Sequence, residues 1–317
     1  MRERDSHPIA RRRGKRRFDD EDDHHNIPAR PPAEEEWQDR VPERWRLPVG
    51  DGQDTFDGPP EGDRWSTWDV SAAGERGPKP YPHWLVTDLG AVDTELGMLK
   101  TGKEADVFLL ERAVPDTDRG CLLASKRYRS SEHRMFHRDA GYLEGRRVRR
   151  SRENRAMANR TSFGRQMIAA QWAQAEFGAL CRLHEIGAPV PYPVQIVGTE
   201  LLMEYIGDAD GTAAPRLAQT RPDADELAGL WDQAVEATVT MARLGLAHGD
   251  LSPYNILVHR GRLVLIDLPQ IVDVIANPQG PEFLARDARV VATWFAARGL
   301  PDTDSLPERL SKEAGLS

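Results

Sequence analysis

Three polar residues, Asp250, Asn255 and Asp267, lie in a largely apolar stretch of the sequence, HGDLSPYNILVHRGRLVLIDLP. Unpaired charges are costly to bury among aliphatic side chains, so these residues need a partner. An amide oxygen from Asn255 and a carboxylate from Asp267 suit a hard divalent cation that is already chelated by phosphates. The second carboxylate, Asp250, could accept a proton from an attacking hydroxyl or water. The pattern therefore predicts phosphoryl transfer, which needs positioning, charge neutralisation and one base.

Each of these residues also has an ordinary structural interpretation. Asp250 could cap a helix, Asn255 could form a turn, and Asp267 could end a strand. Their joint spacing beside HGDL and LID favours a phosphoryl-transfer site over three unrelated roles. His248, just before the loop, is expected to hold it through a backbone hydrogen bond rather than to take part in the chemistry.

The segment TGKEADV, which lies between two predicted strands, could cradle the nucleotide. Gly102 would let the backbone approach a phosphate, because glycine has no side chain to obstruct it. Thr101 and Lys103 would add a hydroxyl and a cation beside it. An ordinary hairpin turn is the competing interpretation of this segment.

Lys126 follows the apolar residues of a predicted strand, LLASKRY, in a chain that has six lysines. A buried lysine needs an acid as its partner, and Glu176 on the next predicted helix is the natural candidate. The pair would orient the ammonium group toward nucleotide phosphates. A lysine at the surface end of a strand is the alternative.

The elements that must position these residues can be read from apolar periodicity and from turn residues. The patterns predict strands in residues 97–112 and 121–128, a helix in 166–187, two strands in 193–207, a long helix in 224–249, a hairpin in 255–269 and a helix in 281–299. Five strands before the long helix, followed by helices and one hairpin, predict an α+β protein with two lobes.

Composition limits the classes of protein. The formal charge of −8 excludes the overall basic excess of a general nucleic-acid binder. Cys121 and Cys181 are far apart and suggest neither a disulfide framework nor a zinc site. No run of about eighteen apolar residues is present, and the N-terminus lacks the apolar core of a secretory signal. We therefore expect a cytoplasmic protein with no membrane partner.

Composition also predicts the domain boundaries. Residues 1–80 are rich in Pro, Gly and charged residues, and we expect them to be mostly disordered. Residues 81–300 are expected to form the catalytic domain, with an N-lobe over about 81–203 and a C-lobe over about 204–300. Residues 301–317 are expected to form a frayed C-terminal tail.

These motifs resemble the RIO-type atypical protein kinases, more closely the first RIO subgroup in a bacterial-like form. TGKEADVF is similar to the family pattern S-T-G-K-E-A-x-V-[YF], and HGDLSPYNIL with LIDLPQ is similar to H-x-D-L-S-x-x-N and I-D-x-[PS]-Q. The resemblance implies that Asp250 is the catalytic aspartate and Asn255 a metal ligand. Asp267 would bind metal and would also be the proposed site of a transient aspartyl-phosphate. Lys126 and Glu176 match the strand lysine and the helix glutamate.

The resemblance also implies a fold, an activity and ligands. The fold would be a two-lobed kinase-like one, with a small antiparallel N-lobe sheet plus a helix and a reduced helical C-lobe without an activation segment. The activity would be that of a protein serine/threonine kinase that uses ATP and Mg²⁺, or Mn²⁺, can act largely as an ATPase and can phosphorylate itself. LLMEYIG is similar to the connector between lobes, where Met203, Glu204 and Ile206 would lie beside adenine.

Two alternatives stay open from the sequence. Small-molecule phosphotransferases of the aminoglycoside type share H-G-D-L…N…I-D, but TGKEADVF and D-L-P-Q favour the RIO type. The Arg-rich segment Arg146–Arg155 could instead bind RNA or a ribosome through phosphate contacts. A solvated charged segment is the ordinary interpretation of that stretch. The sequence does not identify a protein substrate.

Overall fold

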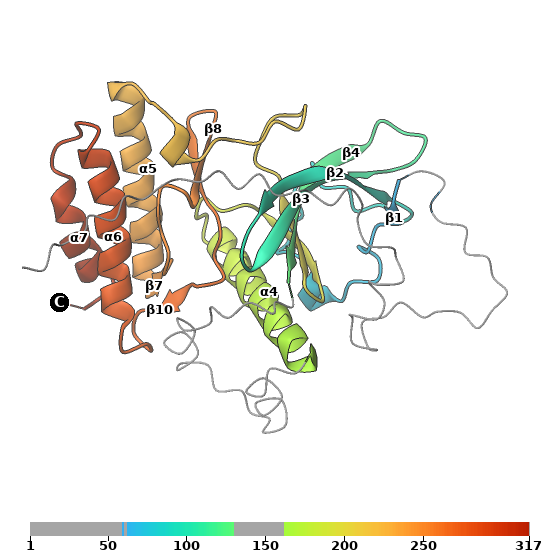
Figure 1. The fold of residues 1–317 in the computed structure, drawn as a ribbon, viewed down its shortest axis with the longest axis horizontal. Coiled ribbons are helices and arrows are strands. Elements are labelled where there is room, and N and C mark those ends of the chain that lie inside the picture. The colour runs from blue at the N-terminus through green and yellow to red at the C-terminus, as the bar shows by residue number, and fades with distance from the viewer. Residues whose placement is uncertain (1–58, 60–61, 130–161, 317) are drawn as a thin grey trace, which may run out of the picture. The chain divides into compact units, whose positions relative to one another are not determined.

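The described part of the chain begins with strands and ends with helices (Figure 1). This computed structural model describes residues 59, 62–129 and 162–316, all of them within a unit that spans residues 40–317. The N-lobe contains a six-stranded antiparallel sheet in the order β1-β2-β3-β4-β6-β5. Its strands are β1 (Arg64–Trp65), β2 (Val92–Thr101), β3 (Ala105–Ala113), β4 (Gly120–Tyr128), β5 (Pro193–Val197) and β6 (Glu200–Glu204). The strands predicted from the sequence are therefore confirmed.

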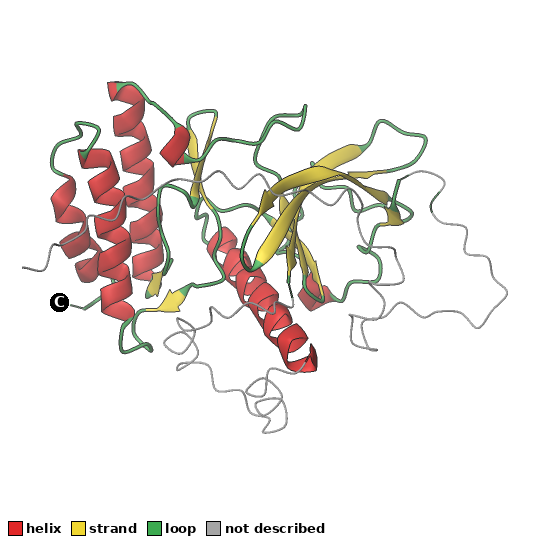
Figure 2. Cartoon of the chain, viewed as in Figure 1, coloured by secondary structure: helices red, strands yellow, loops and turns green. Residues whose placement is uncertain are grey.

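Strand β4 presents a different set of side chains to each face of the sheet, because successive residues of a strand alternate. Lys126 and Tyr128 share one face, and both bond to Glu176 of helix α4 (Ser162–Glu185). This face is therefore the one that α4 covers (Figure 2). The helix ends as predicted before Gly187, whose φ of 76° lies in the left-handed region that ends many helices.

Residues 62–80 are ordered, and the prediction of a mostly disordered segment does not hold for them. Strand β1 pairs with β2, and the Arg64 guanidinium lies 2.9 Å from a carboxylate oxygen of Glu200. Trp68 is buried and packs edge-on against Tyr81. These long-range contacts place the start of the ordered region before residue 81. Residues 1–58 lie outside the described part.

The C-lobe is built from helices and short hairpins. Its elements are α5 (Ala224–Arg243), β7 (Leu246–Ala247), β8 (Ile256–His259), β9 (Arg262–Leu265), β10 (Val272–Asp273), α6 (Gly280–Ala296) and α7 (Leu306–Glu313). Asp223 caps α5 by accepting a hydrogen bond from the Glu226 N–H at 2.9 Å. The helix is shorter than predicted because Gly245, at φ 67°, turns the chain into β7, which pairs with β10.

Helix α7 corrects the prediction of a frayed tail. Leu306 and Leu310 are fully buried, and α7 packs against α5 and α6. Residues 268–279 alone separate Asp267 from α6, so the segment is too short for an extended activation segment. The predicted two-lobed α+β fold with a reduced C-lobe is thus confirmed.

One buried cluster joins the two lobes. It includes Ala124 and Met203 of the sheet together with Leu251 and Leu265 of the C-lobe. The residues that flank the predicted site thus belong to a shared core. Among the described residues, no helix combines the length and the apolar character needed to cross a bilayer.

Candidate active site between the lobes

Lys126 is the central cation of the site. Its Nζ donates to Oε1 of Glu176 at 2.8 Å and to Oδ1 of Asp267 at 2.7 Å. Burial lowers the pKa of Lys126, but the two carboxylates outweigh burial, and the net shift is upward. The predicted Lys126–Glu176 ion pair is therefore present, and Lys126 is held in its charged form beside Asp267.

Glu176 links three segments that are distant in sequence. Besides Lys126, it accepts hydrogen bonds from the Tyr128 hydroxyl on β4 and from the Leu268 N–H at 3.0 Å. Burial raises the pKa of Tyr128, and the neighbouring Glu176 carboxylate raises it further. Tyr128 therefore stays a hydrogen-bond donor at neutral pH. The sequence analysis did not identify Tyr128, although its i+2 spacing from Lys126 places both on one face of β4.

Asp267 follows β9 with an unusual backbone, since its φ of 68° lies in the left-handed region that aspartate adopts more readily than most residues. Burial raises the pKa of Asp267, but Lys126 outweighs this and holds it below the usual value of 3.8. The side chain is 36% exposed. Asp267 therefore offers an ionised carboxylate that is partly accessible to solvent.

Asn255 is fixed next to the Asp267 segment. Its Nδ2 donates to the Asp250 carbonyl at 2.8 Å, which orients the side-chain amide. Oδ1 is the atom of this amide that could bind a metal ion. Its own carbonyl accepts from the Ile266 N–H at 3.0 Å. His248 Nε2 lies 3.0 Å from the Ile266 carbonyl, as expected for a residue that holds the loop. The hairpin β8–β9 thus brings the backbone of Asn255 next to Ile266, the residue before Asp267.

Asp287 on α6 fixes the other side of this loop. Its carboxylate accepts the N–H of Gly249 at 2.8 Å and that of Leu251 at 3.1 Å, and its side chain is buried. Burial raises the pKa of Asp287 even though these donors oppose the shift. The sequence analysis missed this residue. The sequence feature that could have identified it is an acid on the apolar face of a helix, next to Leu284 and Ala288 in FLARDARVV.

Asp250 is more accessible than His248 and Asn255, which are buried. Its side chain is 48% exposed, and one carboxylate oxygen accepts from Arg286 at 3.3 Å. Arg286 and Asp287 are consecutive on α6, so one turn of this helix contacts both the backbone and the side chain of the loop. An accessible carboxylate held in place suits the predicted role of a base.

The glycine-containing turn lies apart from these interactions. The Gly102 N–H donates to the Ala105 carbonyl at 2.9 Å, and a Cβ at Gly102 would lie 2.9 Å from that oxygen. The Thr101 hydroxyl lies 2.8 Å from the Met98 sulfur, and both Thr101 and Lys103 are exposed. The structure therefore brings none of the three predicted residues of this turn into contact with Lys126 or Asp267.

Backbone hydrogen bonds hold the connector between the lobes at Glu204 and at Ile206. The Glu204 N–H donates to the Tyr192 carbonyl at 2.8 Å, and the Ile206 carbonyl accepts from Ala214 at 3.0 Å. Because the Glu204 N–H and the Ile206 carbonyl are engaged, the adenine hypothesis would use the Glu204 carbonyl and the Ile206 N–H. Met203 is buried and is paired with Ala124 across the sheet, so it would form the floor of such a site.

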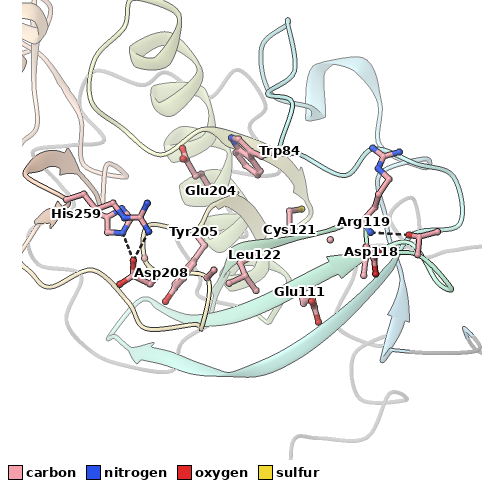
Figure 3. Close-up of a pocket in the computed structure, with 16 residues that line it drawn as sticks. Trp84, Glu111, Asp118, Arg119, Cys121, Leu122, Glu204, Tyr205, Asp208 and His259 are labelled. Carbon is pink, nitrogen blue, oxygen red and sulfur yellow. Dashed lines mark hydrogen bonds and ion pairs between the residues drawn. The ribbon is translucent and has the colours of Figure 1, made fainter.

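A pocket of about 720 Å³ lies beside the connector (Figure 3). Glu204 and Tyr205 line it, together with Leu122 of β4. Leu122 precedes Lys126 by four residues, which is about 13 Å along an extended strand. The pocket therefore adjoins the connector and does not contain the Lys126–Asp267 pair.

Comparison with known proteins identifies the family. The family model of the RIO domain matches residues 122–306, which is more than half of the chain. This chain belongs to the RIO kinase family. The match includes Lys126, Glu176, Asn255 and Asp267, and it ends at the first residue of α7.

Relatives in two domains of life share this similarity. The chain is 35% identical to the RIO-type serine/threonine-protein kinase Rio1 of Haloferax volcanii over 73% of each chain. It is 34% identical to the serine/threonine-protein kinase RIO1 of Caenorhabditis elegans over 65% of this chain but only 38% of that protein. A solved Rio2 kinase–ADP/Mg²⁺–phosphoaspartate complex from Chaetomium thermophilum matches at 19% identity over 69% of each chain, with a TM-score of 0.47.

The residues of this RIO family member fit a magnesium ion that arrives with a nucleotide. Among the described residues, no group of three or more His, Cys, Asp or Glu side chains could hold a metal by itself. Asn255 and Asp267 supply two hard oxygen donors, and Mg²⁺ commonly takes one or two protein ligands and completes its shell with phosphates and water. The donor set thus suits Mg²⁺ bound to ATP rather than a resident metal centre.

Proposed function

We propose that this chain is a protein serine/threonine kinase that transfers the terminal phosphate of ATP in a Mg²⁺-dependent reaction. The observation that carries the proposal is the double contact of the Lys126 ammonium, with Glu176 at 2.8 Å and with Asp267 at 2.7 Å. This contact joins a cation from the N-lobe to a candidate metal ligand from the C-lobe. A triphosphate with its metal ion requires both groups at one place.

Each site residue has one task in the proposed reaction. Lys126 would orient the phosphates, while Asn255 Oδ1 and Asp267 would hold Mg²⁺, or Mn²⁺ in its place. The metal supplies neutralisation of phosphate charge. Asp250 would accept the proton of the attacking hydroxyl while the oxygen of that hydroxyl bonds to the terminal phosphorus and ADP leaves. Arg286, at 3.3 Å from Asp250, supports this by holding the carboxylate in place.

The nucleotide contacts expected from the sequence complete the proposal. The backbone of Glu204 and Ile206, above Met203, would bind adenine. Gly102 and Lys103 would approach the phosphates. The exposed position of Thr101, with its hydroxyl at Met98, gives this residue the weakest support in the set.

A second outcome of the same chemistry is ATP hydrolysis through Asp267. Its low pKa keeps the carboxylate ionised, which a nucleophile requires. Attack by a carboxylate oxygen on the terminal phosphorus would form an aspartyl-phosphate and release ADP, and water would then release phosphate. Such turnover would consume ATP without a stable phosphoprotein.

The remaining expectations concern partners and location. The comparisons favour the RIO family over small-molecule phosphotransferases. Contact of Arg146–Arg155 with RNA or a ribosome stays a hypothesis, because that segment lies outside the described residues. A cytoplasmic location and autophosphorylation also stay hypotheses.

The experiment follows label from [γ-³²P]ATP with Mg²⁺ into free phosphate and into protein. It compares the wild type with Asp250→Ala, Asp267→Ala and the control Asp232→Ala, which removes an exposed carboxylate on α5. We expect the wild type and the control to consume ATP and the two site variants to lose at least about a hundredfold in turnover. Unchanged consumption in both site variants would rule out the assignment.

The stability of the labelled protein separates the two outcomes. An acyl phosphate on Asp267 would be cleaved by hydroxylamine, whereas phosphoserine or phosphothreonine would survive. Label that resists hydroxylamine supports kinase activity toward hydroxyl groups. Label that hydroxylamine removes supports the ATPase route.

A further inference from the structure

Lys100 occupies the strand position directly before the glycine-containing turn and shares a face with Lys126. It is paired with Val107 across β2 and β3, and Val107 is paired with Lys126 across β3 and β4. Residues opposite one another in adjacent strands point to the same face of a sheet. Neighbouring strands are about 4.8 Å apart, so the two lysine backbones lie about 10 Å apart across this face.

This shared face is the one from which Lys126 reaches Asp267. Val107, which lies between the two lysines in the sheet, packs against the buried cluster that contains Ala124 and Met203. Thr101, the next residue after Lys100, is paired with Asp106 and points to the opposite face. The register therefore directs the side chain of Lys100, an exposed residue, to the side of the sheet that carries Lys126.

The charges around Lys100 come from both lobes. Burial lowers the pKa of Lys100, Arg216 and Lys126 lower it further, and Asp267 raises it. Arg216 belongs to the C-lobe and donates to the Tyr254 carbonyl at 2.6 Å, one residue before Asn255. Lys100 and Lys126 thus share Asp267 as a neighbouring charge. Lys100 is exposed, and in the described part of the chain no ion pair or hydrogen bond engages its ammonium group.

Lys100 and Lys126 both lower the pKa of Asp267, and Lys126 already shares its charge with Glu176. Arg216 acts on Lys100, so three cations here outnumber the two carboxylates. An excess of positive charge favours a polyanion. Lysine acts on phosphate as a flexible point charge, so it needs no fixed planar partner.

We propose that Lys100 binds the terminal phosphates of the nucleotide and makes this site selective for ATP over ligands without a phosphate chain. The inference rests on the proposed function, because it adds a contact to the same nucleotide site. Lys103, on the exposed turn, differs from Lys100 in that no strand register directs it toward Asp267.

The experiment measures dissociation constants of the full chain for Mg²⁺·ATP and for adenosine by isothermal titration calorimetry. The variants are Lys100→Gln, Lys100→Arg and the control Lys312→Gln, which removes the same charge from the exposed surface of α7. We expect Lys100→Gln to weaken ATP binding about tenfold, as for loss of one charge-assisted hydrogen bond. Adenosine binding should stay within about twofold, which also shows that the variant is folded. Lys100→Arg should recover most of the ATP affinity.

Three results would overturn the inference in distinguishable ways. Equal ATP affinity of Lys100→Gln and Lys312→Gln would reject the Lys100 contact and leave the proposed function intact. An equal loss of ATP and adenosine binding in Lys100→Gln would show that Lys100 acts through the fold. Failure of the wild type to bind ATP would reject the proposed function itself and, with it, the role of Lys100.

Discussion

The loop from His248 to Asn255 and the turn from Thr101 to Ala105 differ in how firmly they are held. Asp287 accepts two backbone N–H groups of the loop, and Asn255 and His248 tie it to Ile266. In the turn, the Gly102 N–H donates to the Ala105 carbonyl and the Arg129 N–H donates to the Glu104 carbonyl, but Thr101 and Lys103 are exposed. The loop that carries Asp250 and Asn255 is thus held by side-chain contacts as well as by its backbone, whereas the turn exposes side chains that are proposed to approach the phosphates.

This difference follows from what each region is expected to do. Groups that stabilise charge in a transition state work best when they are already oriented, because reorientation during the reaction costs free energy. Elements that admit and release a ligand belong to the less stable parts of a fold. Lys126 connects the two regions, since it lies on the sheet that carries the turn and bonds to Asp267 of the C-lobe.

The strongest test of this connection replaces Lys126 with methionine. Removal of one member of a buried ion pair leaves the other uncompensated, so the free energy of unfolding should fall by about 3–5 kcal/mol. ATP turnover should be lost. Urea denaturation monitored by circular dichroism gives the first quantity. A variant as stable as the wild type would show that the contacts of Lys126 with Glu176 and Asp267 do not stabilise the folded protein.

Asp287→Ala should have the next largest effect, because it acts on the firmly held loop. The N–H groups of Gly249 and Leu251 would lose their acceptor, at a cost of about 1–3 kcal/mol for each unsatisfied buried group. Turnover should fall more than ATP affinity, since Asp250 would lose its position while the N-lobe stays intact. Asp287→Asn, with one acceptor oxygen, should fall between the wild type and the alanine variant. Equal turnover in Asp287→Ala and Asp232→Ala would contradict the account.

Tyr128→Phe tests how much the hydroxyl of Tyr128, on strand β4, supports the Lys126–Glu176 ion pair. The substitution removes one hydrogen bond to Glu176 and keeps the ring in place, so we expect a loss of about 1 kcal/mol in unfolding free energy. Glu176 keeps Lys126 and the Leu268 N–H as partners. ATP turnover should therefore decrease only several-fold. Loss of all turnover would mean that the hydroxyl has a direct part in the reaction.

Thr101→Ala should have the smallest effect. The side chain is exposed and contacts Met98, so the free energy of unfolding should change by less than about 0.5 kcal/mol. Affinity for ATP, measured by calorimetry, should change less than about threefold. A tenfold loss of affinity would indicate that the turn rearranges around the nucleotide and brings Thr101 to it.

The sequence predicted those parts of the molecule whose evidence is local. The 255–269 hairpin and the role of His248 could be predicted because apolar periodicity, turn residues and motif spacing lie within short segments. The pairing of Lys126 with Glu176, 50 residues apart, was predicted instead from the need of a buried lysine for an acid. Residues 62–80 were not, since their order depends on contacts such as that of Arg64 with Glu200, which is 136 residues away.

Two other features were missed for related reasons. Helix α7 is short, and its stability comes from the burial of Leu306 and Leu310 against other helices rather than from a long apolar pattern. Asp287 makes its bonds to backbone groups of a distant loop, which no motif in the sequence around it records. Helix α7 and the contacts of Asp287 therefore depend on tertiary packing, which local sequence patterns do not reveal.

The most direct test of the central claim measures Mn²⁺ binding by electron paramagnetic resonance, with Mn²⁺ in place of Mg²⁺ and a non-hydrolysable ATP analogue present. The account predicts that the wild type and Asp232→Ala bind the ion with the nucleotide, and that Asn255→Ala and Asp267→Ala each weaken ion binding at least about tenfold. Ion affinity in both site variants equal to that of Asp232→Ala would contradict the claim that Asn255 and Asp267 meet at a nucleotide-bound metal.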